Sequence, residues 1–381
     1  MDALEEGVGD GMEKANKTAE QKSGEFSAIF RNAVDLAGQA LQGLADKSKD
    51  IFVNMLTAGD EYNQAMNQLS ASTGATGEEL ESLKDIAKGV FANKYGESYE
   101  DVANAVADVR KNLGEVSDEE LKTVTESAFA LRDVFEYDIG ESTRAVKAMV
   151  ENFGISGENA MSLIAAGSQN GLDYSGELLD SISEYSVQFA KLGLGADDMF
   201  KIFNSGAENG AWNLDKIGDA VKEFSIRAID GSTTTAEGFS ALGMDADEMA
   251  LKFANGGESA KTAFQETVSA IVSMEDPVAR DAAGVALFGT MWEDLGVEAV
   301  ASLGRIEGGA YDAENAMNAI KSVKYDDIGN ALEGLRRTVG NLTIDAKADF
   351  SAGIAGAIGT LVNALNSANV DISVIFAGLV G

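Results

Sequence analysis

The feature that most constrains this chain is an apolar stripe of helical spacing between residues 30 and 69. Apolar and small residues recur there at alternating intervals of four and three, which places them on one side of a helix about eleven turns long. The stripe consists of Phe30, Val34, Ala37, Leu41, Leu44, Ser48, Ile51, Met55, Ala58, Tyr62, Ala65 and Leu69. Two covers fit this pattern equally well: later helices of the same chain, or another copy of the chain in a coiled coil.

Composition favours helices over the rest of the chain as well. The only proline among 381 residues is Pro277, whereas glycine occurs 42 times. Because proline breaks helix interiors, its near absence suits long and closely spaced helices. The apolar fraction of 45% is normal for a chain that buries a core. We predict an all-α fold: a long coiled-coil-like N-terminal helix, a multi-helix bundle, and an apolar helical segment at the C-terminal end.

Helix start signals recur about every 15 to 25 residues after the stripe, without an exact repeat period. A capping residue followed three positions later by Glu satisfies the free N–H groups of a helix start. The pairs with this spacing are Thr76 with Glu79, Ser117 with Glu120, Thr234 with Glu237, and Asp245 with Glu248. Asp276 before Pro277 is a further start, since proline is favoured at the first helical position.

Apolar residues after these starts share faces of helical period. The predicted faces are Leu80, Leu83, Ala87, Val90 and Phe91; Leu121, Val124, Ala128, Leu131 and Phe135; and Leu178, Ile182, Tyr185, Phe189 and Leu192. Residues 224–229 are the best strand candidate, and they fit a helix equally well. Trp212, Phe288, Met291 and Trp292 are predicted to anchor the packing of the core.

The residue types that are missing exclude much chemistry. The chain has no histidine and no cysteine, which removes the Ser-His-Asp triad, thiol nucleophiles, structural zinc and disulfides. Acidic clusters at 118–120, 197–198 and 326–327 could imitate paired catalytic carboxylates or a calcium site. We interpret them as solvated acids at helix starts, where negative charge is favoured. The prediction is a protein that is not an enzyme and has no cofactor or metal site.

The net charge is −34, from 63 acidic and 29 basic residues. Phosphate backbones and anionic membrane surfaces repel such a chain, so we expect no nucleic-acid binding. The same acidity is explained in part by solubility alone.

The C-terminal region differs from the rest. Residues 350–370 carry no charge and are long enough to span a bilayer, although polar residues within them also fit a core or coiled-coil helix. The chain stops inside a further apolar run, as the front part of a longer protein would, and its N-terminus shows no signal peptide. The predicted division is 1–70 for the lead-in and long helix, 71–325 for the helical core, and 326–381 for the linker and apolar segment.

Three segments resemble the phage tail tape-measure family. Residues 221–244 read VKEFSIRAIDGSTTTAEGFSALGM and contain Phe224 and Arg227. Residues 276–280 read DPVAR with Pro277, and 285–296 read VALFGTMWEDLG with Phe288, Met291 and Trp292. Upstream, EYNQAM at 61–66 and STGATGEEL at 72–80 are similar to the start of the same domain in siphophages of Gram-positive hosts. The resemblance covers residues 55 to 305.

The resemblance implies a structural protein of the virion tail that lies in the tube lumen after synthesis in the host cytoplasm. It would set tail length as a template for the tail-tube protein and leave during genome ejection. Its partners would be further copies of itself, which makes the stripe an oligomer seam, together with the tail-tube protein, tail assembly chaperones and distal tail or baseplate proteins. Residues 350–381 would contact the host membrane. Family members are usually much longer than this chain.

Two other functions fit the residues. One is a non-catalytic helical binding module that pairs with a partner helix along the stripe. The other is a tail-associated cell-wall hydrolase that uses two carboxylates, although no segment here resembles one.

Overall fold

A computed structural model of the chain describes residues 48–306, 311–313, 315–325 and 337, without the side chains of 48–60 and 323–325. The chain divides into two units by its contacts: Tyr62–Arg337, and the two ends Met1–Glu61 and Thr338–Gly381. The first unit holds nearly all the described residues. The division predicted at 70 and 325 stays a prediction.

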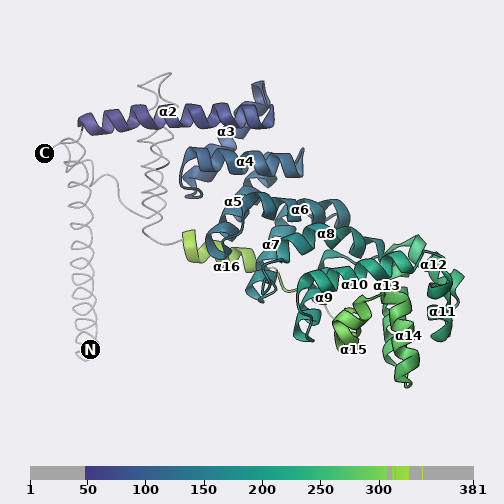
Figure 1. Ribbon diagram of the computed structural model, residues 1–381. Coiled ribbons are helices and arrows are strands. Elements are labelled where there is room, and N and C mark those ends of the chain that lie inside the picture. The colour runs from purple at the N-terminus through teal and green to yellow at the C-terminus, as the bar shows by residue number, and fades with distance from the viewer. Residues whose placement is uncertain (1–47, 307–310, 314, 326–336, 338–381) are drawn as a thin grey trace, which may run out of the picture. The chain divides into compact units, whose positions relative to one another are not determined.

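The described part of the chain is built from fifteen helices and no strand, which confirms the all-α prediction (Figure 1). The helices are α2 (Ser48–Thr73), α3 (Gly77–Ala92), α4 (Tyr99–Leu113), α5 (Asp118–Phe135), α6 (Ile139–Phe153), α7 (Gly157–Gln169), α8 (Leu178–Lys191), α9 (Ala196–Glu208), α10 (Leu214–Arg227), α11 (Thr233–Ala241), α12 (Ala246–Asn255), α13 (Gly257–Val272), α14 (Pro277–Phe288), α15 (Met291–Leu303) and α16 (Ala316–Tyr325).

Helices α3 to α10 form a stack of helix hairpins in two layers, which we call the hairpin stack. In one layer α4, α6, α8 and α10 pack in that order, and in the other α3, α5, α7 and α9 do the same. Each hairpin therefore contacts mainly the hairpin before it and the one after it, as in solenoid proteins. The predicted multi-helix bundle is thus a repeating stack, a regularity that the helix start signals did not reveal.

The repetition is also seen in the spacing of the residues that cap the helices. Ser98 and Asp138 accept hydrogen bonds at the starts of α4 and α6, from the N–H groups of the third helical residues. Ser117 and Ser156 do the same for α5 and α7. The spacing from Ser98 to Asp138 is nearly the same as that from Ser117 to Ser156. Both layers therefore share one period, which at roughly 40 residues per hairpin lies within the usual length of a solenoid repeat.

Polar bonds between successive hairpins fix their register. Asn112 on α4 donates to Thr143 on α6 over 2.7 Å. On the other layer, the N–H of Gly157 at the start of α7 donates to the carboxylate of Glu120 on α5 over 3.0 Å. Such bonds are specific in geometry, so a hairpin that slipped by one turn would leave part-buried polar groups without partners.

Helices α11 to α15 close the end of the stack, and we call them the closing helices. They gather around an aromatic cluster whose centre is Phe224 at the end of α10. Its ring lies 5.3, 5.1 and 5.0 Å from the rings of Phe253, Phe264 and Phe288. The closing helices do not follow the period of about 40 residues seen in the hairpin stack, since they are irregularly spaced along the chain.

A close backbone approach joins the closing helices to the hairpin stack. Gly193, in the turn between α8 and α9, has a φ of +70° and lies against the carbonyl of Gly257 at the start of α13. A Cβ at Gly193 would overlap that carbonyl. Beside this contact, Lys261 on α13 forms a 2.8 Å ion pair with the nearly buried carboxylate of Asp198 on α9.

After α15 the chain runs back along the layer of α9, α7 and α5. The Tyr311 ring packs 5.4 Å from Phe200 of α9, and its hydroxyl accepts a 2.8 Å hydrogen bond from Asn170. Helix α16 then packs on α7 and α5 (Figure 1). Arg337 reaches α3 and the turn after it. We call residues 311–313, 315–325 and 337 the return segment.

Several local predictions can be checked against the helix ends. The starts at Ser117, Asp245 and Asp276 are confirmed, because each side chain accepts a hydrogen bond from its helix. The Thr76 side chain makes no cap bond, so that capping box is wrong. The Thr234 start is also wrong, since Ser232 is the cap of α11 and lies upstream of it.

The strand candidate at 224–229 belongs to the end of α10 and the turn that follows. Among the described ranges, no helix combines the length and apolarity needed to cross a bilayer. Residues 350–370 lie outside those ranges, and so does the acidic pair at 326–327.

Candidate interaction surfaces

The apolar stripe reaches the described side chains only at its C-terminal end. Tyr62 and Leu69 are buried, and the Tyr62 ring meets the Tyr99 ring of α4 edge-on at 5.0 Å. This end of the stripe is thus covered by the chain's own helices. Ser48, Ile51, Met55 and Ala58 lie on helix α2, and Phe30, Val34, Ala37, Leu41 and Leu44 lie outside the described residues. For those positions the oligomer seam stays a proposal.

The residues singled out by the resemblance meet at the aromatic cluster. Phe224, Phe288, Met291 and Trp292 are buried, and the indole N–H of Trp292 donates to Asp281 over 3.2 Å. A buried indole usually finds such a partner, so the arrangement is that of a packed core and not of a ligand site.

Arg227 and Pro277 act at the borders of this cluster. The Arg227 guanidinium pairs with Glu223 at 3.2 Å and donates to the carbonyl of Ala286, which ties α10 to α14. Pro277 occupies the first turn of α14, where its missing N–H costs nothing. The Asp276 side chain caps the same helix and accepts from the N–H of Val278 over 2.9 Å.

Trp212 contradicts the prediction that it anchors the core. It lies in the turn between α9 and α10 and is 86% exposed. Its apolar character alone suggested burial, but the residue lies outside the helices, where helical periodicity does not decide which side chains are buried. A large exposed aromatic side chain is a common anchor of protein–protein contacts.

Two other exposed apolar side chains lie at or after the ends of α5 and α7, as Trp212 lies after the end of α9. Tyr174, between α7 and α8, is 46% exposed, and its hydroxyl donates to the carbonyl of Ala211, next to Trp212, over 3.3 Å. Val134, at the end of α5, is 45% exposed. We call Tyr174 and Trp212 the aromatic edge. They follow the hairpin period, since their spacing along the chain is close to that of the caps.

Burial and neighbouring carboxylates affect two tyrosines in this region: Tyr174 of the aromatic edge, and Tyr137, which lies between α5 and α6. Burial, with a contribution from Glu177, raises the pKa of Tyr174. Burial also raises the pKa of Tyr137 to about 12, and the nearby Asp173 adds to that shift. Burial is the main cause of both shifts, so these phenols are largely shielded from water, and Glu177 and Asp173 add nearby negative charge.

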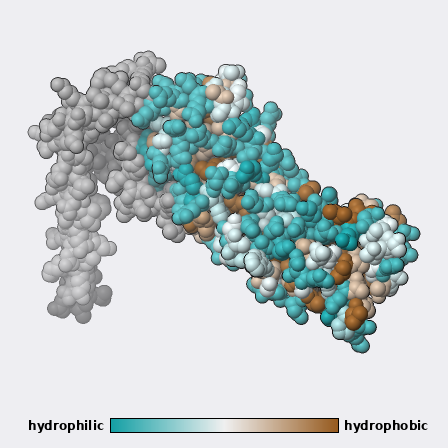
Figure 2. Space-filling model, viewed as in Figure 1, coloured by the Kyte–Doolittle hydropathy of each residue, from teal (hydrophilic) through white to brown (hydrophobic). Residues whose placement is uncertain are grey.

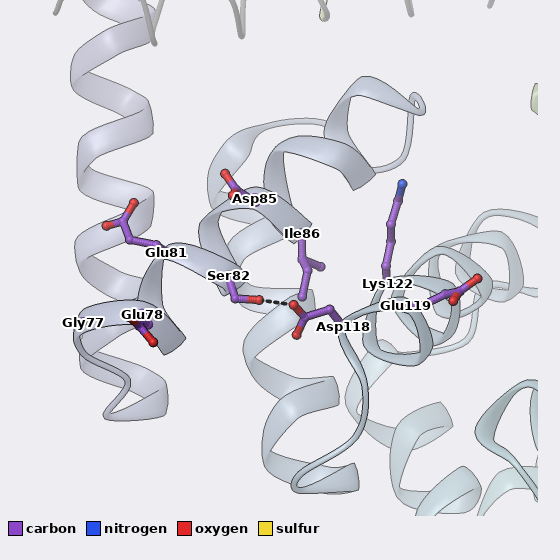
Figure 3. A pocket seen from close by; sticks show the side chains of 9 residues that line it. All are labelled: Gly77, Glu78, Glu81, Ser82, Asp85, Ile86, Asp118, Glu119 and Lys122. Atoms are coloured by element: carbon purple, nitrogen blue, oxygen red, sulfur yellow. Dashed lines mark hydrogen bonds between the residues drawn. The ribbon is translucent and has the colours of Figure 1, made fainter.

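An acidic groove lies between α3 and the start of α5 (Figure 3). Its volume is about 950 Å³, and its residues are Gly77, Glu78, Glu81, Ser82, Asp85, Ile86, Asp118, Glu119 and Lys122. Ser82 donates to Asp118 over 2.5 Å across the groove, and Lys84 on the same helix pairs with Glu81 at 2.7 Å, which lowers the pKa of that carboxyl through a hydrogen bond and charge. The groove is wide and open, and its acids serve mainly as first-turn residues of α3 and α5.

The acidic pair at 197–198 also has structural partners. Asp198 accepts from the N–H of Gly195 over 3.0 Å and thereby caps α9. Asp197 accepts from the N–H of Tyr311 in the return segment, also over 3.0 Å. In the described part of the chain, no group of three or more acidic side chains is arranged to hold a metal ion.

Surface hydropathy separates the two parts of the molecule. On the face drawn in Figure 2, teal surface predominates over α3 to α6, and most brown surface lies over the half that holds the closing helices. The exposed apolar residues of the closing helices are Leu251, Val272, Val278 and Val285. This part of the molecule and the aromatic edge are therefore the candidate interaction surfaces.

Comparison with known proteins gives one family. The model of the family described as "Phage-related minor tail protein" matches residues 89–289, which is just over half of the chain. The match runs from the last turn of α3 to the glycine that ends α14. It therefore covers most of the hairpin stack and of the closing helices.

Two relatives align with a similar length of the chain. The probable tape measure protein of Streptomyces phage phiC31 is 26% identical over 241 residues, which are 61% of this chain and 33% of that protein. The uncharacterized protein YqbO of Bacillus subtilis strain 168 is 26% identical over 245 residues, 63% of this chain and 15% of that protein. The chain thus spans a third or less of either relative. No solved structure matches it.

Proposed function

Because the chain belongs to the phage-related minor tail protein family, we propose that it is a structural component of a phage tail and acts as a length template for tail-tube assembly. The observation that carries this proposal is the match over 89–289, since it coincides with the folded helices and not with a short motif. The likeness to the probable tape measure protein of phage phiC31 supports the template role.

A non-enzymatic role fits the chemistry of the described residues. Histidine and cysteine are absent from the sequence. The acidic pair Asp197 and Asp198 serves α9 and the return segment, and Asp118 binds Ser82. These carboxylates have structural partners, which supports an architectural protein.

The proposed partners follow from the same role. Further copies of the chain would pair along the stripe between residues 30 and 55, inside the tube lumen. The tail-tube protein, tail assembly chaperones and distal tail or baseplate proteins would contact the remaining surface. We extend the proposal to genome ejection, in which the chain leaves the tail and residues 350–381 reach the host membrane.

Tail length in virions assembled with this chain tests the template role. Deletion of residues 33–53, three heptads of the stripe, should shorten tails by about 32 Å at 1.5 Å per residue. The matched control replaces the same residues by a heptad sequence of equal length and should leave tail length unchanged. Tails of normal length after the deletion would remove the template role, and immuno-electron microscopy that places the chain outside tails would remove the tail assignment itself.

The aromatic edge favours a second candidate, a helical binding module. Trp212 offers an 86% exposed indole to a partner, and the half-exposed Tyr174 bonds to the residue beside it. Two results together would favour this function over the template. Purified tail proteins would shift the fluorescence of Trp212, and tail length would stay the same after every deletion in the chain.

A further inference from the structure

The chain enters the unit Tyr62–Arg337 beside the start of α4. Tyr62 is 7% exposed, and its ring meets the Tyr99 ring at 5.0 Å. Lys88 of α3 lies 5.4 Å from the centre of the same Tyr62 ring. Two helices of the first hairpin therefore hold the entrance.

The chain leaves the unit beside the end of α3. The Arg337 guanidinium stacks 4.4 Å from the Phe91 ring. It also donates to the carbonyls of Tyr95 and Gly96, over 3.2 and 2.9 Å. The same guanidinium donates to the carbonyl of Phe91 in the last turn of α3 over 3.4 Å, so a cation from the far end of the unit satisfies part of the C-terminal end of that helix.

Entrance and exit share one aromatic pair. The Phe91 and Tyr99 rings are 4.3 Å apart, and Tyr62 packs on one of them while Arg337 packs on the other. Three steps lead from the Arg337 guanidinium to the Tyr62 ring: 4.4 Å to Phe91, 4.3 Å from Phe91 to Tyr99, and 5.0 Å from Tyr99 to Tyr62. The guanidinium and the Tyr62 ring can therefore be no farther apart than the sum of these distances. Helix α16, which packs on α5 and α7, marks the route by which the chain comes back.

We infer that residues 62–337 form a side domain whose two chain exits lie together, so that the domain adds surface but almost no length to the extended protein. As one straight helix, the 276 residues from 62 to 337 would span about 410 Å. Folded as observed, they separate the flanking chain by a few per cent of that distance. The statement about tail length rests on the proposed template function, whereas the statement about the exits does not.

Labelling at introduced cysteines tests the geometry in the full chain, which has no cysteine of its own. One variant carries Glu61→Cys with Thr338→Cys, next to the two exits. The matched variant carries Glu61→Cys with Glu275→Cys, an exposed site before α14. Three interhelical steps lead from α4 to α10, about 25 to 30 Å at 8–10 Å each, and α14 lies beyond them.

Energy transfer between the dyes should be high for the 61/338 pair and much lower for the 61/275 pair. Adding Arg337→Ala should reduce transfer in the 61/338 pair and leave the 61/275 pair unchanged, because only the exit is released. The inference is overturned if the 61/338 pair shows energy transfer equal to or lower than that of the 61/275 pair. Circular dichroism must show that both variants are folded.

Tail length separates this inference from the template role. One virion carries 54 extra residues as fifteen helical turns after Thr57 in α2, and another carries 54 extra residues as a helical hairpin after Gly210, an exposed turn. We expect tails about 81 Å longer in the first case and unchanged tails in the second. Equal lengthening in both would overturn the side domain but keep the template. No lengthening in either would remove the template, and the dye distances would then decide on the side domain alone.

Discussion

The hairpin stack and the closing helices solve the same packing problem with different means. In the stack, successive hairpins repeat at a nearly constant spacing, and polar side chains such as Asn112 and Thr143 bond across each step. In the closing helices, Phe253, Phe264 and Phe288 gather around Phe224 of the adjoining α10, and the helices have no common period. Register in the first case depends on hydrogen bonds, and closure in the second depends on buried aromatic area.

The difference teaches where each kind of interaction is useful. A stack of repeats needs interactions that specify one register, because neighbouring hairpins present similar apolar faces that could pack in several ways. Hydrogen bonds supply this specificity, since they form in only one register. An end needs a large buried area in few residues, and aromatic side chains supply it. The stack should therefore tolerate the loss of apolar volume better than the closing helices do.

The largest expected effect tests that statement with two fully buried phenylalanines. Phe224→Ala should lower the free energy of unfolding by about 4 kcal/mol, since three neighbouring rings lose their partner. Phe189→Ala in the stack, where the ring meets Phe203 at 5.5 Å, should cost about 3 kcal/mol. Urea unfolding followed by circular dichroism measures both. A larger loss for Phe189→Ala would reverse the comparison.

Two glycines beneath aromatic rings give the next effect. A Cβ at Gly218 would overlap the Tyr185 ring in the stack, and one at Gly284 would overlap the Trp292 ring in the closing helices. Each Gly→Ala change should cost about 2 to 3 kcal/mol, because the ring must move. Only Gly284→Ala should also shift the emission of Trp292.

Gly89→Ala is the matched control for these two variants. Gly89 lies inside α3, and its nearest neighbour is the flexible end of Lys122 at 3.3 Å. Alanine there should be neutral or should stabilise the helix by up to about 1 kcal/mol. A loss at Gly89 as large as at Gly218 would mean that helix packing, and not ring overlap, explains the cost.

Alkaline pH should loosen the stack before the closing helices. Burial raises the pKa of Tyr137 to about 12, and burial also raises the pKa of Tyr185, which donates to Asp215 over 2.6 Å. Because each folded pKa lies above the unfolded value near 10, the stabilisation is complete below pH 10 and is lost as pH rises. For Tyr137 the window is pH 10 to 12, and the loss is at most about 3 kcal/mol.

Thermal unfolding between pH 9 and 12 measures this loss. In the Tyr137→Phe variant, stability should depend less steeply on pH in this range. Near pH 8 the variant should lose only the contribution of the 2.8 Å hydrogen bond to Ser168. Residues 233–303 contain no tyrosine, so Trp292 emission should change last. Emission of Trp292 that changes first would contradict the order.

The smallest effect concerns the two tryptophans. Trp212→Ser should change the free energy of unfolding by less than about 0.5 kcal/mol, since the side chain is 86% exposed. Acrylamide should quench Trp212 strongly in a Trp292→Phe variant and should hardly quench Trp292, which is 3% exposed, in a Trp212→Phe variant. Equal quenching of the two would show that Trp212 is covered.

Local rules predicted the elements of the fold well. Helical periodicity placed Leu178, Ile182 and Tyr185 on one buried face, and Asp276 with Pro277 marked the start of α14. Such signals act within one helix, where the spacing of residues alone fixes which of them share a face. For the same reason the all-α class followed from the sequence.

Relations between helices did not follow from the sequence. The hairpin period is visible only when each cap is compared with the cap of the second helix after it, because helix lengths vary. These pairs are Ser98 with Asp138 and Ser117 with Ser156. The exposed Trp212 lies in a turn between helices, and the contact of Arg337 with α3 joins distant parts of the sequence. Neither leaves a periodic signal.

The contact of Gly193 with the carbonyl of Gly257 has an evolutionary consequence. Apolar faces elsewhere in the unit can exchange one aliphatic side chain for another of similar volume as the sequence drifts. At this joint no side chain of any kind fits, and the positive φ of Gly193 adds a second reason for glycine. Substitution can therefore exchange apolar residues elsewhere, whereas Gly193 must remain glycine for α13 to meet the turn after α8 in this way.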